Sequence, residues 1–559
     1  MKTILTTINA KYIHTSLGLR WLYVVNKGRF DISFREYTLR EDVKTISGEI
    51  IETGCDVVGI SVSIWNAEKS RLLSLQLKKQ NPKIIIIAGG PEVSYEPGYF
   101  LKNWEIDYVV SGEGEFVLGE LLDALKNEKE VEIAGVSSKT KISKITVKAD
   151  IEKLLSYPSP YQLEEDRKEM KNRLIYFETS RGCPYRCQYC LSSLEKGVRY
   201  FPQEYIAENL KYIIESDVRQ VKFLDRTFNL NKRHTAFVFN FLLKNYRPNL
   251  SFQFEIYADL LNEAMIDFLN DNVPENYFRF EIGVQSTHEP TNISVMRKQD
   301  FPLLAHNIHR LMDGGKIDLH LDLIAGLPHE NYERFVKSFN DVFGLGAKEV
   351  QLGFLKLLRG TALRKRASAF GYVYDEKPPY EVISNNNISK LELDRIRDAE
   401  RALEKFWNSG RFTRTMNRLV SGEYKERYFE LFDEIGQFYN TRKLPHSAYQ
   451  LEDLFRYLNQ FLQSKNIDAS ATLRDDYYSN FTIRPTGYWT DRIDKKSRRK
   501  LLHAIAQNEE FLQENGLTGR VIEKQTAIDR LENGKYLLTV YLENERKQLE
   551  YQMDKMDLK

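Results

Sequence analysis

Short apolar runs alternate with helical patterns twice along this chain, and the alternation constrains the fold more than any other feature. Strands that alternate with helices form a mostly parallel sheet with helices on both faces. Over about the first 125 residues the apolar runs are ILTTIN from residue 4, DISFREY from 31, DVVGISV from 56, KIIIIAG from 83 and IDYVVSG from 106. We therefore expect a five-stranded, flavodoxin-like (Rossmann-type) domain over residues 1–128.

Small and polar residues follow the strands of this first series, at the edge where open parallel sheets bind their ligands. They include Ser61 and Ser63 after the third run, Gly89 and Gly90 after the fourth, and Gly112 after the fifth. The glycines alone can equally well serve tight turns. Their spacing is not the G-x-G-x-x-G pattern of dinucleotide sites.

A second series of six apolar runs follows a linker at residues 129–170. The linker contains VSSKTKISKITVKA, expected to be an exposed hairpin, and SYPSPY, whose prolines cannot lie inside a helix. The six runs are LIYFETS from 174, VKFLD from 221, FQFEI from 252, FRFEIGV from 278, LHLDLIAG from 319 and EVQLGF from 349. They predict a partial (β/α)6 barrel over residues 171–375, with its chemistry at the C-terminal ends of the strands.

The remaining residues, 376–559, have the apolar spacing of helices through LELDRIRDAERALEKFW and YQLEDLFRYLNQFLQ. Near the end, TAIDRLENGKYLLTVYLENE alternates apolar positions around an Asn-Gly pair, which indicates a hairpin. We expect a mainly helical domain ending in β-strands. LRDDYYSNFTIRP (473–485) can line a substrate pocket, but a capped helix end with a surface loop is the simpler interpretation. DRIDKKSRRK (491–500) can contact a phosphate, but a solvated helical face is the simpler interpretation.

Composition excludes several classes of protein. The 81 Lys and Arg residues balance 79 Asp and Glu, so the charge does not require a nucleic-acid or membrane partner. The longest strongly apolar run, residues 84–88, is far shorter than the ~18 residues of a membrane span. The N-terminal sequence MKTILTTINAK lacks the apolar region of a secretory signal. We expect a cytoplasmic protein with no membrane partner.

Three of the four cysteines, Cys183, Cys187 and Cys190, form a C-x3-C-x2-C triplet directly after the first strand of the second series. Four cysteines in a chain of this length do not form a disulfide framework. A structural zinc ion takes four closed ligands, whereas three thiolates on a cubic iron–sulfur cluster leave one iron free. The alternative is a zinc site completed by a distant histidine such as His234. Cys55 stands apart, and we expect it to be a buried small hydrophobe.

With this triplet, its position and the aromatic Tyr189 before the last cysteine, the sequence resembles the radical SAM superfamily. The resemblance implies a [4Fe-4S] cluster held by Cys183, Cys187 and Cys190, whose free iron binds S-adenosylmethionine (SAM). In that superfamily the reduced cluster cleaves SAM to a 5'-deoxyadenosyl radical, which the protein positions and shields. The resemblance also implies an electron donor such as flavodoxin or ferredoxin.

Later strands carry elements similar to the SAM-binding pattern of that superfamily. The second-strand element, FLDRTFNLN at 223–231, has the acid Asp225 but lacks the usual glycines. Each polar residue alone can instead be a buried group satisfied by the backbone. We expect Arg226 and Arg279 to pair with Asp225 and Glu281 in ordinary salt bridges. The residues that the resemblance assigns to SAM are Tyr189, Asp225, Glu255, Gln285, Ser286, Asp322 and Gly326.

A flavodoxin-like domain ahead of a radical SAM barrel is similar to the cobalamin-binding class of radical SAM proteins, over about residues 1–375. NAKYIHTSLGLR from 9, GGPEVSYEP from 89 and SGEGE from 111 resemble loops of that class, in which cobalamin lies between the two domains. Cobalamin domains that ligate cobalt through a histidine resemble one another in an Asp-x-His-x-x-Gly sequence, and this chain has Tyr12 where that Asp would stand before His14. The resemblance therefore implies no histidine ligand to cobalt. The residues assigned to cobalamin are Asn9, His14, Ser16, Ser61, Ser63, Gly89, Gly90, Pro91, Gly112 and Glu113.

These resemblances imply a cobalamin-dependent radical SAM enzyme, a C-methyltransferase that acts on an unactivated carbon through the 5'-deoxyadenosyl radical and methylcobalamin, with two SAM molecules in different roles. Two alternatives stay open: a non-methylating rearrangement or cyclisation, and modification of a tRNA base. Residues 376–559 resemble a C-terminal domain of unknown function found in a subset of these proteins, and we expect it to capture the substrate. That substrate, a small molecule or a tRNA, is not specified by the sequence.

Overall fold

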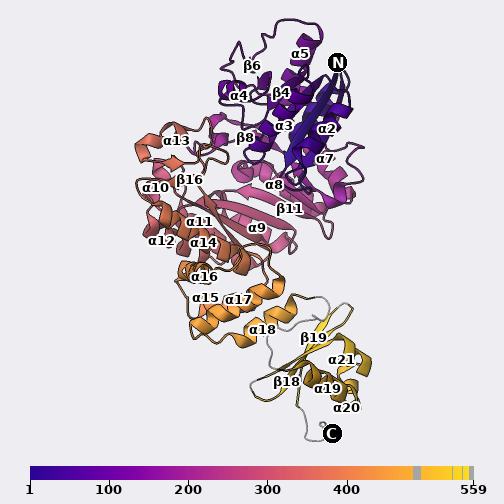
Figure 1. The fold of residues 1–559 in the computed structure, drawn as a ribbon, viewed down its shortest axis with the longest axis vertical. Helices are drawn as coiled ribbons and strands as arrows, with labels where there is room; N and C mark the ends of the chain where they lie inside the picture. Colours follow the sequence, from indigo (N-terminus) through magenta and orange to yellow (C-terminus); the bar gives the residue numbers. More distant parts are fainter. Residues whose placement is uncertain (482–492, 532, 544, 553–559) are drawn as a thin grey trace. The chain divides into compact units, whose positions relative to one another are not determined.

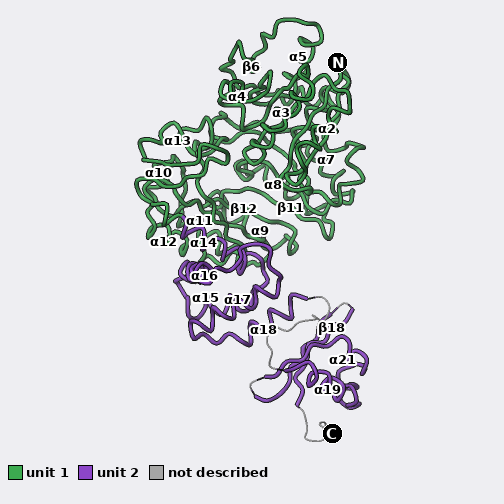
Figure 2. Tube along the Cα trace, in the orientation of Figure 1, with its two compact units in different colours: residues 1–393 green, residues 394–559 purple. Residues whose placement is uncertain are grey.

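The computed structural model describes residues 1–481, 493–531, 533–543 and 545–552. They form two compact units, Met1–Leu393 and Asp394–Lys559 (Figure 2). Within these described ranges, no helix is both long and apolar enough to cross a bilayer. Residues 482–485 of LRDDYYSNFTIRP and residues 491–492 of DRIDKKSRRK lie outside the described residues.

The first series of strands forms a six-stranded sheet in the order β2-β1-β3-β4-β5-β6 (Figure 1). The five expected strands pair in parallel, and β6 is antiparallel to β5. The strands are β1 (Lys2–Asn9), β2 (Asp31–Thr38), β3 (Val57–Ser61), β4 (Ile85–Gly89), β5 (Tyr108–Val110) and β6 (Val136–Ser138). The helices are α1 (Leu17–Asn26), α2 (Val43–Glu52), α3 (Ala67–Gln80), α4 (Pro97–Asn103), α5 (Glu115–Lys126) and α6 (Ile151–Leu154).

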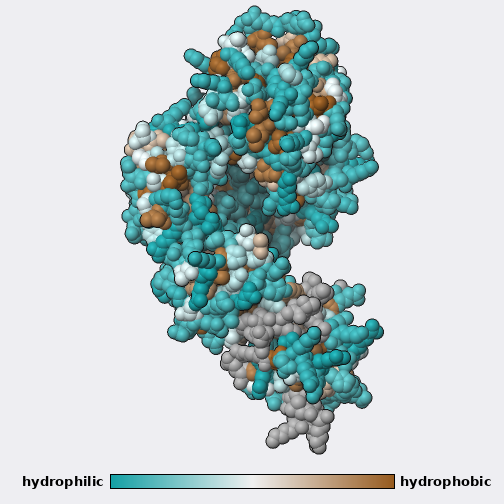
Figure 3. All heavy atoms as spheres, viewed as in Figure 1, coloured by the Kyte–Doolittle hydropathy of each residue, from teal (hydrophilic) through white to brown (hydrophobic). Residues whose placement is uncertain are grey.

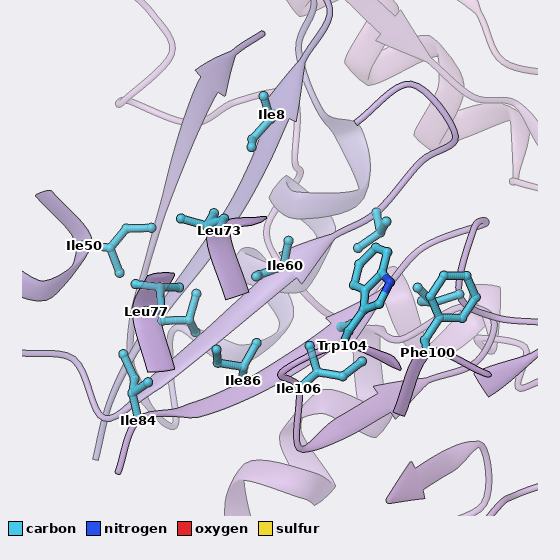
Figure 4. Close-up of a cluster of buried hydrophobic side chains, with 14 of the residues drawn as sticks. Ile8, Ile50, Ile60, Leu73, Leu77, Ile84, Ile86, Phe100, Trp104 and Ile106 are labelled. Atoms are coloured by element: carbon cyan, nitrogen blue, oxygen red, sulfur yellow. The ribbon is translucent and has the colours of Figure 1, made fainter. Parts of the chain in front are cut away.

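Apolar side chains fill both faces of this sheet. Figure 4 shows Ile60 and Ile86 of the strands packed against Leu73 and Leu77 of α3. A second cluster lies on the face covered by α1 and α5. A strand buried on both faces must be apolar at successive positions, which explains the unbroken apolar runs of β3 and β4. Cys55 belongs to the first cluster, and its expected burial is confirmed.

The lysine-rich segment is not the free hairpin that its alternation predicted. Its first strand, β6, pairs with β5, and Val147 forms an isolated parallel bridge with Gly112. Gly112 has a φ of 98°, and a Cβ there would collide with the Val147 carbonyl oxygen, so a glycine is required. The prediction was wrong because an exposed sheet edge offers unpaired backbone groups that a neighbouring segment satisfies.

The second series forms a sheet of six parallel strands in the order β14-β13-β12-β11-β10-β7, which agrees with the predicted partial barrel. These strands are β7 (Leu174–Phe177), β10 (Gln220–Phe223), β11 (Ser251–Ile256), β12 (Phe278–Gln285), β13 (Asp318–Ala325) and β14 (Glu349–Phe354). Two short ladders join β8 (Ser180–Gly182) to β9 (Val198–Tyr200) and β15 (Val373–Tyr374) to β16 (Val382–Ser384). The helices are α7 (Gln203–Glu215), α8 (Lys232–Lys244), α9 (Glu263–Asn272), α10 (Glu289–Ser294), α11 (Phe301–Gly314), α12 (Tyr332–Phe343) and α13 (Ala362–Lys365).

One face of the second sheet carries charged side chains that pair across strands. Lys222 Nζ lies 2.6 Å from Glu281 Oε2. Arg279 Nη2 donates to Glu349 Oε2 at 2.5 Å. The predicted pair of Arg279 with Glu281 was therefore wrong, because each side chain reaches a partner two strands away on the same face of the sheet, Arg279 across β13 and Glu281 across β11.

The second unit is mainly helical and ends in strands, as expected. The predicted hairpin is formed by β17 and β18, and β19 extends it to a three-stranded antiparallel sheet. Asp476 accepts from the backbone N–H of Arg414 and of Thr415, at 3.1 and 2.8 Å, which gives this acid of LRDDYYSNFTIRP a structural role. The elements are α14 (Lys390–Leu403), which begins in the first unit, α15 (Thr413–Ser421), α16 (Tyr428–Arg442), α17 (Leu451–Ser464), α18 (Ser470–Ser479), α19 (Lys495–Ala506), α20 (Glu509–Asn515), α21 (Gly519–Gln525), β17 (Thr526–Arg530), β18 (Tyr536–Tyr541) and β19 (Arg546–Tyr551).

A buried acid links the first sheet domain to the segment before β16. Glu92, on the loop after β4, hydrogen-bonds with the Tyr380 hydroxyl, which also accepts from Arg359 Nε at 3.0 Å. Burial raises the pKa of Glu92 to about 7.

We expect Glu92→Gln to stabilise the first unit above pH 7 and to change little below pH 5. The pKa of Glu92 is higher in the folded state than in the unfolded state. Its carboxyl therefore contributes most to the free energy of unfolding at acidic pH, and this contribution is lost as the pH rises through about 7. Complete ionisation costs roughly 3 kcal/mol for a shift of this size. Chemical denaturation of both proteins at about pH 5 and pH 8 measures the difference, and an equal gap at the two pH values contradicts the assignment.

Candidate active site

The cysteine triplet lies on the loop that follows β7 and β8, and its three thiols line one cavity of about 250 Å³. Cys183 and Cys187 are buried and Cys190 is half-buried. The other walls come from the C-terminal ends of β11, β12 and β13, where a barrel places its chemistry. Of the residues assigned to the cluster and to SAM, those that line the cavity are Cys183, Cys187, Cys190, Tyr189, Glu255, Gln285 and Asp322.

A bulge at the end of β12 directs Gln285 into this cavity. The pairing register with β13 shifts between Gly283 and Gln285, and Gln285 has a φ of 68°. The side chain of Gln285 folds over Gly283, and a Cβ atom at position 283 would collide with Gln285 Nε2. The buried Oε1 of Gln285 has no hydrogen-bond partner among the described residues. An unpaired acceptor in a strained position at a strand end is suited to bind a donor group of a ligand.

Two tyrosines and an arginine of the cavity were missed by sequence reasoning. The rings of Tyr185 and Tyr257 stack with centroids 4.2 Å apart. Arg297 lies over the Tyr257 ring, 4.8 Å from its centroid, and donates to the Tyr257 hydroxyl at 2.9 Å. Burial raises the pKa of Tyr257 well above its usual range. Tyr257 and Arg297 come from separate segments outside the cysteine motif, so no local signal identifies them. Tyr185 stands between Cys183 and Cys187, and its place inside the triplet could have indicated it.

Arg226 also lines the cavity and does not pair with Asp225. Its Nη1 lies 3.9 Å from Glu255 Oε2. Asp225 is buried and accepts hydrogen bonds from Thr179 Oγ1 at 2.6 Å and Ser180 Oγ at 2.5 Å, and burial raises its pKa to about 6. The predicted salt bridge was wrong because these hydroxyls already satisfy the carboxylate. Asp225 lies outside the cavity lining, and its role toward SAM stays a prediction.

The histidine of the zinc alternative lies apart from the thiols. His234 Nε2 is 2.7 Å from Thr179 Oγ1, and its ring lies 4.7 Å from that of Tyr200. Burial lowers the pKa of His234 to about 4. His234 Nε2 therefore has a hydrogen-bond partner within the protein, and His234 does not serve as a fourth metal ligand beside the three thiols.

Ser286 and Gly326, also assigned to SAM, have internal contacts instead of a place in the cavity lining. Ser286 Oγ donates to Glu330 Oε1 at 2.6 Å. The Gly326 carbonyl oxygen accepts from the Tyr372 hydroxyl at 3.0 Å and from Asn385 Nδ2 at 2.9 Å. These partners account for both residues without a ligand, so their roles toward SAM remain predictions.

We expect Gln285→Ala to weaken SAM binding about tenfold, because a buried hydrogen bond to a ligand contributes about 1–2 kcal/mol. Ser286→Ala is the matched comparison: it removes the adjacent polar group, which faces Glu330, and should lower thermal stability and weaken SAM binding less than Gln285→Ala does. Calorimetric titration of SAM into both cluster-loaded variants makes the comparison. If Ser286→Ala raises the SAM dissociation constant more than Gln285→Ala does, Gln285 is not the residue that contacts SAM.

A second cavity, of about 170 Å³, lies at the C-terminal ends of β3, β4 and β5. Leu19 and Leu22 of α1 and Leu118 of α5 supply apolar walls. Glycines dominate the rim, so little side-chain bulk narrows the opening. Of the residues assigned to cobalamin, those that line this cavity are Ser61, Gly89, Gly90, Gly112 and Glu113.

The other residues assigned to cobalamin, Asn9, His14, Ser16, Ser63 and Pro91, lie outside the lining of that cavity. Asn9 Nδ2 donates to the carbonyl oxygen of His14 at 3.0 Å, and Ser16 caps α1. His14 Nδ1 lies 2.9 Å from the hydroxyl of Tyr176 on β7. Burial lowers the pKa of His14. The contact joins the two sheets, so His14 has a packing role that requires no cobalt.

We expect the His14→Ala protein to bind cobalamin as the wild type does. The Co(II) form of wild type should show no superhyperfine splitting from a protein nitrogen in its electron paramagnetic resonance spectrum. Tyr176→Phe, which removes the hydroxyl partner of His14 and keeps the ring, serves as the control for the packing role. Nitrogen splitting that disappears in His14→Ala would reverse the conclusion.

Arg181, two residues before Cys183, ties the cysteine loop to the first sheet domain. Its guanidinium lies 3.0 Å from Glu113, 2.7 Å from Glu115 and 2.8 Å from Glu178. Arg199 also pairs with Glu113. Glu113 follows β5 and lines the second cavity, so one ion-pair network connects the rim of that cavity to the strand that leads into the cysteine loop.

Three family models match successive parts of the chain. The B12 binding domain covers residues 4–122, the radical SAM superfamily residues 177–342, and a protein of unknown function, DUF4080, residues 368–551. The chain is a B12-binding radical SAM protein. The combination confirms the resemblance that the cysteine triplet and the flavodoxin-like domain indicated.

This B12-binding radical SAM protein has relatives that carry methyltransferase names. It is 27% identical over 331 residues to an uncharacterized methyltransferase of Pyrococcus horikoshii, which covers 57% of this chain and 70% of the relative. It is 22% identical over 440 residues to the cobalamin-dependent radical SAM methyltransferase TokK of Streptomyces tokunonensis, covering 72% of this chain and 63% of TokK. The structure of OxsB with aqua-cobalamin bound has a TM-score of 0.60 at 15% identity and covers 86% of this chain and 81% of OxsB, which shows the shared fold.

The B12-binding radical SAM protein is an enzyme whose domains imply three cofactors, a [4Fe-4S] cluster, SAM and cobalamin. The residues of the first cavity fit the cluster and SAM, because three thiols meet Gln285 with its unpaired acceptor. The second cavity fits a part of cobalamin, since its glycine rim opens at the ligand edge of the sheet. A radical SAM enzyme also requires a reductant and a substrate.

Proposed function

We propose that this B12-binding radical SAM protein is a C-methyltransferase that methylates an unactivated carbon. The observation that carries the proposal is the cavity in which Cys183, Cys187 and Cys190 meet Gln285, within the same unit as the glycine-rimmed cavity of a B12-binding domain. The methyltransferase names of two relatives support the same reaction.

The chain's own residues divide the work of binding. The three thiolates would hold the cluster, and Glu255, Gln285 and Asp322 would orient SAM beside it. The bound cofactors supply radical formation from SAM and a transferable methyl group. The stacked pair of Tyr185 and Tyr257 excludes water from one wall, which protects a reactive species from side reactions.

The second cavity would receive the planar base of the cobalamin nucleotide tail. Its 170 Å³ and its apolar walls suit a flat heteroaromatic group, whereas the corrin ring is larger than the cavity. At the rim, Ser61 would donate to the phosphate and the Glu113 carboxylate would accept from amide groups of the cofactor outside the cavity. Replacing Gly89 with a leucine should therefore weaken cobalamin binding while leaving the iron content of the cluster unchanged.

The reaction is tested by anaerobic incubation of cluster-loaded, cobalamin-loaded enzyme with a low-potential reductant and SAM that carries a trideuterated methyl group. A cell extract split into metabolites and tRNA supplies the substrate pool. A trideuteromethyl mass gain in one fraction, with equal amounts of 5'-deoxyadenosine and S-adenosylhomocysteine, is the expected result. 5'-Deoxyadenosine with an altered product that gains no methyl indicates rearrangement or cyclisation, and a labelled nucleoside from the tRNA fraction indicates base modification.

We also propose that residues 376–559 capture the substrate. The motifs for the cluster and SAM lie before this segment, and it retains its own apolar cores. The full-length enzyme should retain the unmethylated substrate from which the labelled product forms, and this retention supports the role. The identity of the precursor follows from the same mass analysis.

A further inference from the structure

His320 lies buried on the charged face of the second sheet, two residues before Asp322 on β13. Strand residues two positions apart point to the same face, so both side chains project to the side of the sheet that carries the cross-strand ion pairs. Figure 3 shows hydrophilic residues lining a hollow in the middle of the first unit. His320 is only 5% exposed, so the groups around it decide where its proton lies and how its ring is oriented.

The pairing register places His320 between two acids. It stands opposite Glu281 of β12 on one side and opposite Glu349 of β14 on the other. His320 Nδ1 lies 4.0 Å from Glu281 Oε1 and 3.7 Å from Glu349 Oε1. Arg279 Nη2, which donates to Glu349, lies closer still, 2.9 Å from His320 Nδ1. The guanidinium is therefore the hydrogen-bond partner of this nitrogen.

The contact with Arg279 fixes the tautomer of His320. A guanidinium donates hydrogen bonds and accepts none, so Nδ1 must be the acceptor and the proton of the neutral ring is on Nε2. His320 Nε2 lies 3.1 Å from Asp322 Oδ1. Both atoms are buried, and neither has another partner among the described residues. Burial opposes the charged form of the ring, but the contact with Asp322 raises the pKa of His320 above its usual value.

Asp322 lines the first cavity, and His320 does not. The Oδ1 atom of Asp322 is buried against His320, whereas the side chain as a whole is 35% exposed. The other carboxylate oxygen is therefore left for the cavity. A carboxylate held at one oxygen cannot rotate freely, so a ligand that binds the other oxygen pays less conformational entropy to order the side chain.

We propose that His320 is a positioning residue for SAM, which holds the carboxylate of Asp322 in the orientation that accepts a hydrogen bond from SAM. SAM carries suitable donors on its ammonium group and on its ribose. Glu349 and Arg279 hold His320 from the far side, so a chain of contacts across three strands ends at the cavity. The proposal rests on the SAM site of the proposed function and does not depend on methyl transfer.

The test compares two amides in place of the imidazole. Glutamine reaches the position of Nε2, so His320→Gln keeps a donor toward Asp322 and an acceptor toward Arg279. Asparagine is one carbon shorter and reaches only the position of Nδ1, so His320→Asn keeps the acceptor alone. Calorimetric titration of SAM into the cluster-loaded variants should give a dissociation constant about fivefold above wild type for His320→Asn and within about twofold of wild type for His320→Gln. Equal losses in the two variants, or no loss in His320→Asn, overturn the proposal.

A double-mutant cycle shows whether His320 acts through Asp322. Asp322→Asn should weaken SAM binding, and His320→Asn added to it should cause no further loss. A further loss as large as that of His320→Asn alone means that the histidine acts on another group. The matched control is Asp318→Asn, which weakens a pair with Lys348 on the same face of β13 and lies outside the cavity lining. The control should leave the SAM dissociation constant unchanged, and an effect equal to that of His320→Asn contradicts a specific role for His320.

A measurement on the unmutated chain covers the case in which His320→Asn fails to take up a cluster. Nitrogen NMR of the full chain with labelled histidines, without the cluster and above the pKa of the ring, should show the proton of His320 on Nε2. The spectrum of His320→Gln identifies the signal. A proton on Nδ1 instead rules out the contact with Asp322. SAM affinity and the tautomer are both measured without methyl transfer, so their outcome is separate from that of the labelled-methyl experiment.

Discussion

Replacing any one of Cys183, Cys187 or Cys190 with alanine is expected to remove the cluster and with it all cleavage of SAM. The three thiols share one cavity, and among the described residues no other cysteine lies nearby to take over a lost position. Three thiolates are the minimum that holds a cluster with one open iron. Iron and sulfide content after anaerobic reconstitution, with 5'-deoxyadenosine formation, should both fall to background.

Cys55→Ala is the matched control for this series. Cys55 lies in the apolar core of the first sheet, and its thiol donates weakly to the Ile50 carbonyl oxygen at 3.6 Å. The variant should therefore keep its full iron content and SAM cleavage and lose only a little stability. A cluster that survives in Cys187→Ala, or disappears in Cys55→Ala, would show that the ligands are assigned wrongly.

Replacing Arg181 with methionine is expected to have the largest effect on stability of any single change outside the apolar cores. Arg181 is buried among Glu113, Glu115 and Glu178, whose side chains are at most 15% exposed. Removing the cation leaves the buried Glu115 without a charged partner, while Glu113 keeps Arg199 and Glu178 keeps Trp21, and breaking a buried pair in this way costs about 3–5 kcal/mol. Burial already raises the pKa of Glu115, so the loss of Arg181 leaves this acid the most strained of the three.

Denaturant unfolding of the first unit, followed by tryptophan fluorescence, measures this loss. Trp21 is a suitable probe because its Nε1 donates to Glu178 at 2.7 Å. Arg29→Met, which breaks an exposed pair with Asp123, is the control and should cost less than about 1 kcal/mol. A cost at Arg181 no greater than at Arg29 would mean that the network does not hold the cysteine loop to the first domain.

Much of the fold is predictable from local pattern, because periodicity and turn residues act over short distances. Five parallel strands of the first sheet and six of the second follow from apolar runs that burial requires. The segment at 136–149 shows the limit. Its alternation indicated strands, yet the partner of β6 was set by the exposed edge of β5 and not by the segment itself.

The sequence was enough to identify the cysteine triplet, its place after a barrel strand and the order of the domains, since each of these is a matter of spacing along the chain. It did not determine which polar strand-end residues share a cavity. Gln285 enters the cavity and Ser286 does not, because adjacent side chains at a strand end point to opposite sides, and the register shift between Gly283 and Gln285 sets which of the two faces the cavity.

The ion pairs and the aromatic wall come from contacts between parts of the chain that are far apart in sequence. Arg279 pairs with Glu349 and Arg297 covers Tyr257 across 70 and 40 positions of sequence, respectively. Such contacts depend on strand register and on the path of loops that pack between distant elements. The physical reason is that a long charged side chain takes the nearest partner in space, and nearness in space is fixed only when the whole sheet has formed.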